Sequence, residues 1–396
     1  MQSALDRWGR ANPQTTALVW RLDGRGGGTA VAAYKADVPR IPASTMKLVT
    51  SAGALLQLGP GHRFTTTLLA DPSARRVGKV LKGPVYLRGA GDPVLATRHY
   101  GSAYLRGRST PLTALGTGLK ARGVRLVRGP IVADESLFDR RRLGPGWPSY
   151  YALYIAPLSA LAINQDYAGS GRAAYVTSPT LAAGQRLRAT LRGVGVQQVG
   201  PLRAGRTPRG ARTLATTTSP RLPVILRAMN LDSDNFIAET LVKGVGADAT
   251  GRGTTTAGAR RIRALLAARG ILGPRDALVD GSGLSRRNHL AASSLVHVIA
   301  QADADRTWGR ALVNSLARGG EGTLIRRFTS GVARKRVRAK TGYLDGVSAM
   351  AGRVVSRRGV HYGFALLMNS TDIAGARAVQ DKVVTLLAAG AEDSHP

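Results

Sequence analysis

The hydrophobic and polar positions of the chain change their period several times, and the changes predict a mixed α and β fold. Two β-rich runs at 15–22 and 29–36, joined by a glycine-rich turn, predict a hairpin. Apolar residues at helical spacing predict helices mainly after residue 219, at 220–229, 235–243, 255–268, 292–301 and 374–389. Three more β-rich runs follow the fourth of these helices, at 337–342, 349–356 and 359–369. Strands with short turns and a closing helix indicate an antiparallel sheet flanked by helices, which is an α+β architecture.

The middle of the chain has a different pattern of short strands between helices. Strands are expected at 64–70, 80–88 and 131–134, and a helix is expected at 111–122. The order of helix, glycine and strand in 111–139 returns more weakly at 181–199 and 262–274, and we interpret these echoes as local packing units. The Gly-, Pro-, Arg- and Thr-rich segment 203–218 predicts a linker.

Composition narrows the class of protein. A chain of 396 residues is long enough for two domains with full cores. The absence of cysteine excludes disulfides, thiol catalysis and Cys-ligated zinc. No apolar run approaches the length of a membrane span, which is about 18 residues or more.

The formal charge of +34 is the most unusual property of the sequence. It indicates polyanionic surroundings such as nucleic acid, anionic lipid or a wall polymer. The cations are nevertheless spread along the chain, without a basic helix, a zinc spacing or an aromatic-studded strand. Codon bias towards Arg is an equal explanation, so the charge by itself does not predict a nucleic-acid-binding protein.

The segment from Pro42 to Lys47 carries the clearest chemistry. Ser44 and Lys47 are three positions apart at the start of an apolar, alanine-rich helix that Gly59 and Pro60 end. This spacing places the two side chains on one face, one turn apart, with Ser44 at the helix N-terminus. The arrangement is typical of a serine nucleophile activated by a lysine.

Two further motifs indicate that the spacing of Ser44 and Lys47 is not a coincidence. Ser233, Asp234 and Asn235 are expected in a turn between helices, and Lys340, Thr341 and Gly342 on a strand. The three motifs, in this order, fit the serine acyl-transferases that react with penicillin. In such a site Ser44 is the nucleophile, Lys47 its base, and Lys340 a cation that lowers the pKa of Lys47.

The remaining motif residues complete this predicted site. Ser233 would relay a proton to the leaving nitrogen, and Asn235 would hold Lys47 and the substrate amide. Lys340 and Thr341 would bind a substrate carboxylate, and the strand edge would pair with an extended peptide. The backbone N–H groups of Ser44 and Tyr343 would form the oxyanion hole, and Thr341, Gly342 and Tyr343 are the predicted substrate-binding residues.

The chain resembles the low-molecular-mass class C penicillin-binding proteins, the D-alanyl-D-alanine carboxypeptidase/endopeptidase family S13. Stretches outside the three motifs also carry the resemblance, namely 87–93, 129–138, 159–164, 236–239, 280–285 and 322–324. The resemblance implies a penicillin-binding/β-lactamase-like transpeptidase domain with an inserted, shortened second domain. The expected ranges are 1–68 and 213–396 for the first domain and 69–212 for the insertion.

The resemblance also implies the activity. The expected enzyme is a serine-type D-alanyl-D-alanine carboxypeptidase, with endopeptidase action as a further option, that cleaves peptidoglycan stem peptides through an acyl-enzyme on Ser44. β-Lactams would acylate the same serine, and neither metal nor cofactor is implied. Anionic wall polymers are expected partners, whereas nucleic acid is not. The expected location is the cell envelope outside the cytoplasm. Residues 1–12 lack signal-peptide features, and we therefore expect either a leader that has been removed or a mis-assigned start.

One departure from the family bears on specificity, and two other functions stay open. The family commonly has Thr after Lys-Thr-Gly, where this chain has Tyr343, so endopeptidase action or another leaving group gains weight. The alternatives are a β-lactamase-like hydrolase and a basic, non-catalytic binder of wall polymer or nucleic acid. The acidic residues Asp134, Glu135 and Asp139 are interpreted as part of a turn on the inserted domain, close to a side-chain pocket.

Overall fold

A computed structural model describes residues 1–169, 171–370 and 372–390. The chain divides into two compact units. Unit 1 comprises Met1–Pro60, Leu226–Val245 and Thr255–Pro396, and unit 2 comprises Gly61–Ile225 and Gly246–Thr254. The helices α6 (Leu222–Asp232) and α7 (Asn235–Thr250) each run across a boundary between the two.

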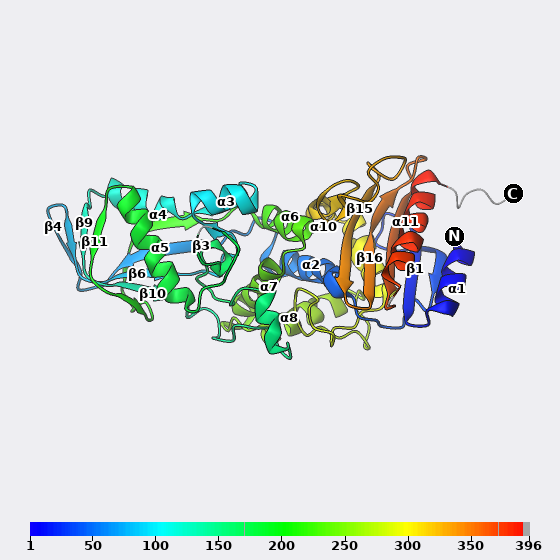
Figure 1. Cartoon of the computed structure of the whole chain (residues 1–396), viewed down its shortest axis with the longest axis horizontal. Coiled ribbons are helices and arrows are strands. Elements are labelled where there is room, and N and C mark those ends of the chain that lie inside the picture. The colour runs from blue at the N-terminus through cyan, green and yellow to red at the C-terminus, as the bar shows by residue number, and fades with distance from the viewer. Residues whose placement is uncertain (170, 371, 391–396) are drawn as a thin grey trace. The chain divides into compact units, whose positions relative to one another are not determined.

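Unit 1 is built on a six-stranded sheet with the order β14-β15-β16-β17-β1-β2 (Figure 1). Every neighbouring pair in this sheet is antiparallel. The strands are β1 (Thr15–Leu22), β2 (Gly28–Tyr34), β14 (Ala317–Arg318), β15 (Val337–Leu344), β16 (Val347–Val355) and β17 (His361–Met368). The central strand β17 is buried almost throughout, because helices cover both faces of the sheet.

Two helices from the ends of the chain pack on one face of this sheet. The helix α1 (Gln2–Ala11) contacts β2, and α11 (Ile373–Ala389) contacts β16, as Figure 1 shows. Their buried side chains, among them Leu5, Val383 and Val384, join sheet residues such as Phe364 in one core cluster. This face of the sheet is therefore sealed.

The other face carries the helix that begins with the predicted nucleophile. The helix α9 (Ala292–Ala304) packs on β1 and β17, and the short 3-10 turn Ala43–Thr45 packs on β15. The helix α2 (Met46–Leu58) follows that turn and contacts α8 (Thr255–Ala267), α9 and α10 (Trp308–Ser315).

The α+β class predicted from the sequence is confirmed.

Unit 2 contains two larger sheets around its own core. The five-stranded sheet has the order β12-β10-β6-β3-β13, and the four-stranded sheet has the order β11-β9-β5-β4. The strands are β3 (Thr65–Ala70), β4 (Arg75–Val77), β5 (Val80–Lys82), β6 (Val85–Arg88), β9 (Leu126–Arg128), β10 (Ile131–Asp134), β11 (Gln197–Val199), β12 (Leu202–Ala204) and β13 (Arg212–Thr218). The helices α4 (Thr113–Ala121) and α5 (Pro179–Gly193) supply Leu115, Leu119, Leu187 and Leu191 to the core. A third helix, α3 (Arg98–Leu105), follows β7 (Leu95–Ala96), which pairs with β8 (Thr110–Pro111).

The weak repeat in the sequence corresponds to a repeated crossover between these two sheets. Each of three strands of the four-stranded sheet continues through a Gly-Pro step into the five-stranded sheet: β5 into β6, β9 into β10, and β11 into β12. The glycines stack closely, since a Cβ on Gly129 would lie 2.1 Å from the Gly83 carbonyl oxygen, and one on Gly200 would lie 2.5 Å from that of Gly129. The third echo, at 262–274, lies in unit 1, where it begins inside α8 and leads into no strand.

The predicted linker at 203–218 is wrong. The segment holds β13, which pairs with β3 in register from Arg212 and Ala70 to Thr218 and Thr65. The run of Thr216, Thr217 and Thr218 favours a strand, but the Gly- and Pro-rich composition of 205–210 concealed it. Since β3 and β13 share one sheet, the compact units divide near 60 and 225, whereas the predicted domain ranges divide at 68 and 212.

Candidate active site

Ser44 lies in a 3-10 turn, Ala43–Thr45, directly before α2. The residue before it, Ala43, has the left-handed φ of 47°, which costs energy for any residue with a Cβ. Two glycines hold this strained corner, because a Cβ on Gly283 would lie 1.9 Å from the Ala43 carbonyl oxygen. A Cβ on Gly342 would lie 2.6 Å from the Pro42 carbonyl oxygen and 3.1 Å from the Ser44 nitrogen. The backbone of β15 therefore lies directly against the peptide of Ser44, the predicted nucleophile.

Lys47 connects the first two sequence motifs. Its Nζ donates hydrogen bonds to Ser44 Oγ at 3.0 Å, to Asn235 Oδ1 at 2.8 Å and to the carbonyl oxygen of Ser282 at 2.7 Å. The lysine is fully buried. All three hydrogen atoms of its ammonium thus have an acceptor, and one acceptor is the predicted nucleophile.

Burial sets the proton affinity of both lysines in the site. It lowers the pKa of Lys47 to about 8, against the opposing effects of Asp280, Glu239 and Asp234. Burial also lowers the pKa of Lys340 well below its usual value, and the nearby Lys47 cation lowers it further. Lys340 Nζ donates to the Thr341 carbonyl oxygen at 2.7 Å. A lysine whose pKa lies near 8 is neutral often enough at neutral pH to act as a base.

The second motif lies in the turn between α6 and α7, as predicted. Ser233 has a left-handed φ of 55°, and Asp234 Oδ1 accepts a hydrogen bond from the Ile237 N–H at 2.9 Å, which holds the start of α7. Asn235, the first residue of α7, is thereby directed at Lys47. Among the described contacts, the Ser233 side chain makes no hydrogen bond to Ser44, Lys47 or Lys340.

The third motif lies on β15, where one edge of the sheet is open to a further strand. The short strand β14 pairs only with Arg338 and Ala339 within the part of the chain that the structure describes. The stretch from Lys340 onward thus has β16 on one side and the Ser44 turn against its face. Tyr343 is 55% exposed, and the Arg377 guanidinium of α11 lies 5.6 Å from its ring centroid. An extended peptide can add to this edge as another strand.

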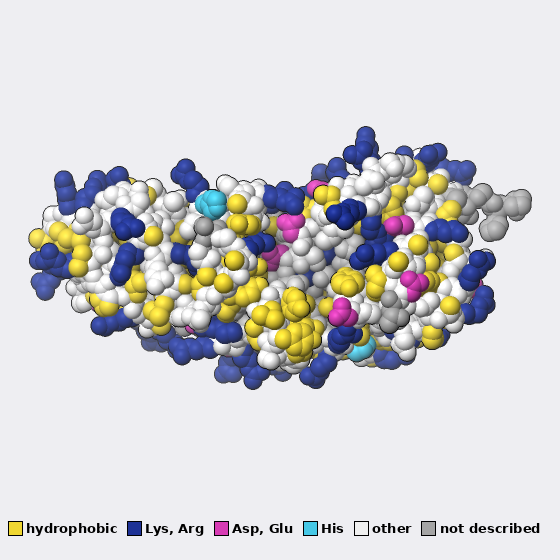
Figure 2. Space-filling view, viewed as in Figure 1, with side chains coloured by type: hydrophobic (Ala, Val, Ile, Leu, Met, Phe, Trp, Pro, Cys, Tyr) yellow, Lys and Arg dark blue, Asp and Glu magenta, His cyan; other side chains and the backbone are white. Residues whose placement is uncertain are grey.

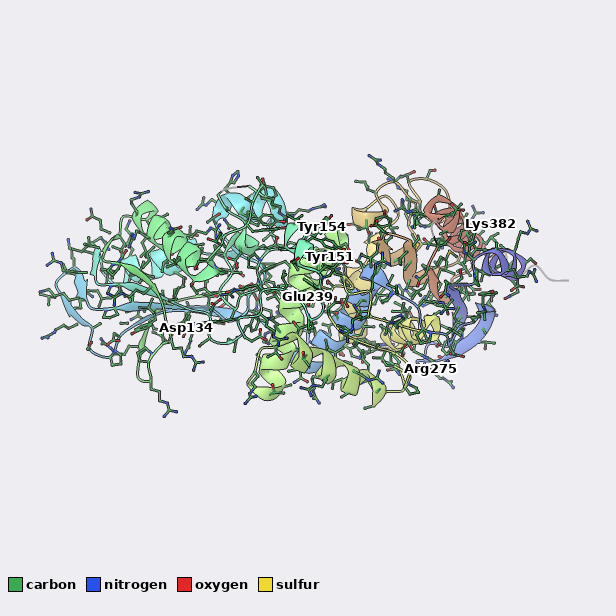
Figure 3. The ribbon with its side chains drawn as sticks, turned by 60° about the horizontal axis from the view of Figure 1, so that its bottom comes forward. Asp134, Tyr151, Tyr154, Glu239, Arg275 and Lys382 are labelled. Carbon is green, nitrogen blue, oxygen red and sulfur yellow. The ribbon has the colours of Figure 1, made fainter. Side chains whose placement is uncertain are left out.

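Glu239, a buried residue to which the sequence assigned no role, positions the loop that accepts a hydrogen bond from Lys47. Glu239, on α7, is labelled in Figure 3 and is fully buried. Its Oε1 accepts the N–H groups of Gly281 at 2.9 Å and Ser282 at 2.7 Å. The carbonyl oxygen of Ser282 in turn accepts from Lys47, and that of Gly281 accepts from Thr50 Oγ1 at 2.7 Å. Glu239 therefore determines where the acceptor for Lys47 lies.

The same loop is tied down by a second carboxylate. Asp280 accepts hydrogen bonds from the N–H groups of Gly283 at 2.8 Å and Ser285 at 2.6 Å, and from the side-chain amide of Asn288 at 2.7 Å.

Burial raises the pKa of Glu239 to about 8, and the charge of Asp280 acts in the same direction. The signals that could have revealed Glu239 were its position four residues after Asn235 and the Asp-Gly-Ser-Gly loop, but neither identifies the partner of the other.

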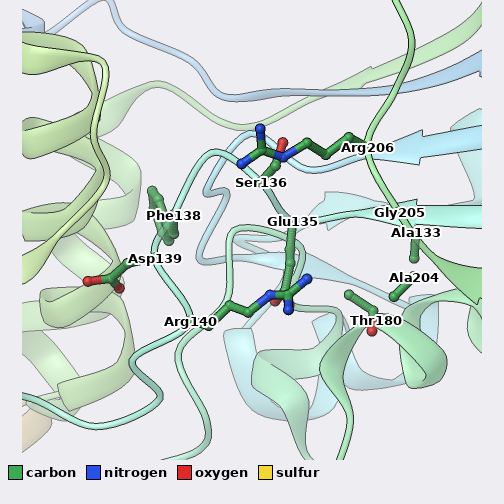
Figure 4. A pocket seen from close by; sticks show the side chains of 10 residues that line it. All are labelled: Ala133, Glu135, Ser136, Phe138, Asp139, Arg140, Thr180, Ala204, Gly205 and Arg206. Carbon is green, nitrogen blue, oxygen red and sulfur yellow. The ribbon is translucent and has the colours of Figure 1, made fainter.

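Asp134 and Glu135 of unit 2 make hydrogen bonds and an ion pair within a turn. Asp134 is buried and accepts the N–H groups of Ser136 at 2.9 Å and Thr207 at 2.8 Å. Glu135 pairs with Arg142 at 2.6 Å and accepts from Ser159 Oγ at 2.6 Å. Figure 4 shows the neighbouring cavity, of about 300 Å³, with Glu135 inside it and Arg140 and Arg206 reaching in from different segments. Asp134 and Glu135 therefore organise the turn between β10 and the following loop.

No cluster of three or more His, Asp or Glu side chains suited to a metal ion occurs in the described ranges. The same ranges hold no helix that is both long and apolar enough to span a membrane.

The fold and the geometry define a class. An antiparallel sheet with helices on both faces, a serine at the start of a buried helix and a lysine bonded to it are the features of a serine hydrolase of the penicillin-binding type. The model of the D-Ala-D-Ala carboxypeptidase 3 (S13) family matches residues 21–170 and 162–390. The chain belongs to this family.

Relatives and solved structures agree with this assignment. "Carboxypeptidase DacB" of Mycolicibacterium smegmatis is 33% identical, with 96% of this chain and 82% of the relative covered. "D-alanyl-D-alanine carboxypeptidase" of Actinomadura sp. strain R39 is 30% identical, with 90% and 78% covered. The crystal structure of penicillin-binding protein 4 from Haemophilus influenzae has a TM-score of 0.79 at 22% identity, covering 96% of this chain and 99% of that one, and shows the same fold.

Removing the Glu239 carboxyl tests whether it positions Lys47. Glu239→Ala leaves two buried N–H groups without an acceptor, which costs about 1–3 kcal/mol each, and releases the Ser282 carbonyl. We expect acylation by benzylpenicillin to slow by about tenfold or more in Glu239→Ala, since each 1.4 kcal/mol lost changes a rate about tenfold. Stopped-flow acylation rates and urea unfolding measure the two effects.

Glu239→Gln is the matched control. Burial raises the pKa of Glu239 and so favours its protonated form, and glutamine preserves the carbonyl oxygen and the shape of that form. We expect Glu239→Gln to retain most of the rate. Unchanged acylation in a folded Glu239→Ala would show that Lys47 does not depend on this carboxyl.

Proposed function

We propose that this chain is a penicillin-sensitive serine-type D-alanyl-D-alanine carboxypeptidase that acts on peptidoglycan stem peptides through an acyl-enzyme on Ser44. The observation that carries the proposal is the contact of Lys47 Nζ with Ser44 Oγ at 3.0 Å inside a buried site. Membership of the S13 family and the names of relatives at 30–33% identity supply the substrate class.

In the first step, neutral Lys47 takes the proton of Ser44 Oγ, and the oxygen attacks the carbonyl carbon of the peptide bond between the two D-alanines. The N–H groups of Ser44 and Tyr343 bind the oxygen that becomes negative. Gly342 is required between them, because any side chain there meets the Pro42 and Ser44 backbone.

The intermediate collapses when the leaving amine receives a proton. Ser233 relays that proton, and the terminal D-alanine leaves while the rest of the peptide stays esterified to Ser44. Water then attacks the ester, with Lys47 again accepting a proton. Asn235 keeps Lys47 and the substrate amide in place, and its Oδ1 accepts a hydrogen bond from Lys47 Nζ at 2.8 Å.

The third motif binds the substrate. Lys340 and Thr341 bind the terminal carboxylate, and the open edge of β15 pairs with the extended stem peptide. Tyr343 replaces the small hydroxyl residue of the family motif, so the hydroxyl that would help to bind the terminal carboxylate is missing, and the exposed ring lies near Arg377 of α11. This difference favours a broader leaving group, so endopeptidase action on cross-links accompanies carboxypeptidase action in the proposal.

β-Lactams acylate the same serine because their strained amide takes the place of the D-alanyl-D-alanine bond. Penicillin-binding protein 4 from Haemophilus influenzae, whose fold is shared, has also been solved in complex with a β-lactam. The substrate places the enzyme in the cell envelope, where an excess of positive charge suits anionic wall polymers.

Mass spectrometry after incubation with benzylpenicillin tests the nucleophile. We expect one equivalent of persistent penicilloyl adduct on the wild-type chain and none on Ser44→Ala. Ser73→Ala, a change in an exposed turn, serves as the control and should acylate normally. Rapid nitrocefin turnover with no persistent adduct would favour the β-lactamase-like alternative, and an adduct on Ser44→Ala would refute the assignment.

The pH dependence of acylation tests the base. Since the pKa of Lys47 is about 8 and only its neutral form accepts a proton, the rate should rise about tenfold per pH unit below 8 and level off above it. Lys47→Arg should be inactive at every pH, because a guanidinium stays charged. A rate that is flat between pH 6 and 9 would exclude Lys47 as the titrating base.

Tyr343→Thr tests the specificity argument. The shorter residue restores the hydroxyl common in the family beside Thr341, so kcat/KM for a soluble peptide ending in D-Ala-D-Ala should rise by roughly tenfold, the value of one good hydrogen bond to a charged group. Tyr343→Phe keeps the ring without a hydroxyl and is the control. Equal values for all three proteins would show that residue 343 does not set this preference.

A further inference from the structure

The four-stranded sheet of unit 2 carries a row of cations across its strands. Arg75 of β4 is the register partner of Lys82 of β5, and Lys82 is the partner of Arg128 of β9. Arg128 is in turn opposite Val199 of β11. Side chains of register partners lie on one face of a sheet, so the three cations form a single line. Figure 1 shows these strands side by side.

This line lies on the solvent side of the sheet. Leu81 and Val127, the residues next to Lys82 and Arg128 along their strands, are buried in the core of unit 2, and strand neighbours point to opposite faces. Arg75, Lys82 and Arg128 are exposed accordingly. In the described part of the chain, no ion pair or side-chain hydrogen bond involves any of the three.

A row of like charges is not expected unless something compensates for it. Like charges directly opposite one another destabilise a sheet, and here Lys82 faces a cation on each side. Unit 2 offers few carboxylates to relieve this, since its sequence contains 26 Lys and Arg but 7 Asp and Glu. Three of these seven, Asp92, Asp134 and Asp166, are buried inside the unit. Figure 2 shows how rarely acidic side chains appear among the basic ones on the visible face.

The charge forms a line instead of a patch. Two residues away on the same face, the next row consists of Val77, Val80, Leu126 and Gln197, which carry no charge. Neighbouring strands are about 4.8 Å apart, so the backbone positions of the outer two cations are about 10 Å apart. A line of this length matches successive charges of an extended, linear polyanion better than it matches a flat anionic surface.

We propose that this row, Arg75, Lys82 and Arg128, is a docking surface for a linear phosphodiester polymer of the cell wall. The choice of a wall polymer rests on the proposed function, which places the enzyme among peptidoglycan and its attached polymers. The strands β4, β5, β9 and β11 have no aromatic residue, so the surface lacks the platforms on which nucleic-acid bases stack. Exposed Val77 and Val199 instead offer aliphatic contacts to a simple polyol backbone.

The test compares two triple variants with the same loss of charge. The row variant is Arg75→Gln, Lys82→Gln and Arg128→Gln in one chain. The control variant is Arg209→Gln, Arg221→Gln and Arg252→Gln, three exposed cations of unit 2 outside the four-stranded sheet. Binding of poly(glycerol phosphate) is measured by titration from 0.05 to 0.2 M salt.

We expect the row variant to lose affinity by tenfold or more and the control variant by less than threefold. The slope of log affinity against log salt should become shallower by about 2 in the row variant, at about 0.7 per cation removed from contact with a single-stranded polymer. Equal losses in the two variants, or none in the row variant, would overturn the proposal, because binding would then follow net charge alone. Oligothymidylate binding that is tighter than poly(glycerol phosphate) binding and depends on the row would overturn the wall assignment in favour of nucleic acid.

Two further readouts separate this proposal from folding defects and from the proposed activity. Lys82→Gln removes the central like charge, so its melting temperature should equal or exceed that of the wild type; a lower value would contradict the repulsion on which the inference depends. Penicilloyl adduct formation on Ser44 should be the same in the row variant, the control variant and the wild type. A wild type that forms no adduct would refute the proposed function, whereas the binding comparison would still decide whether the row is a polyanion site.

Discussion

The burial of the Lys47 side chain is the constraint on which the rest of the site depends. An ammonium without water must have every hydrogen bonded, and here Ser44, Asn235 and the Ser282 carbonyl meet that requirement. The same burial lowers the pKa of Lys47 far enough for it to act as a base. One physical effect therefore orients the Ser44 hydroxyl and, in the proposed mechanism, also activates it.

Each acceptor of Lys47 belongs to a different part of unit 1, and each part is held by its own contacts. Asn235 is positioned by the start of α7, which Asp234 holds through the Ile237 N–H. The Ser282 carbonyl is positioned by Glu239 and Asp280, two buried carboxylates that bind backbone N–H groups of one loop. Ser44 lies on a strained corner that Gly283 and Gly342 can approach because they lack side chains. The strain at Ala43 and Ser233 is tolerated because these contacts determine the backbone on both sides.

Unit 2 is organised by a repeated element that connects its two larger sheets. Three Gly-Pro steps carry the chain from one sheet to the next, and the close stacking of their glycines keeps the strands in register. That register is also what aligns three cations on one face. Under the proposed roles, the cation row attracts polyanions through charge, while the site in unit 1 recognises its substrate through hydrogen bonds and shape.

The sequence alone determined the fold class, the family and the three motifs, because each rests on local order. A serine and a lysine three residues apart share a helix face wherever the helix lies, and the β-rich composition of 337–342 and 349–356 favours strands in any sheet. The domain ranges and the roles of Ser44, Lys47, Ser233, Asn235 and Lys340 stay predictions from the same source. The sequence could not reveal Glu239, the strand at 212–218 or the cation row, since each depends on partners far away in the chain: Ser282, the strand β3, and the strands β5 and β9. Only tertiary structure decides which distant groups share a buried space or a sheet edge, because hydrogen bonding and burial act on distance in space and not on separation in sequence.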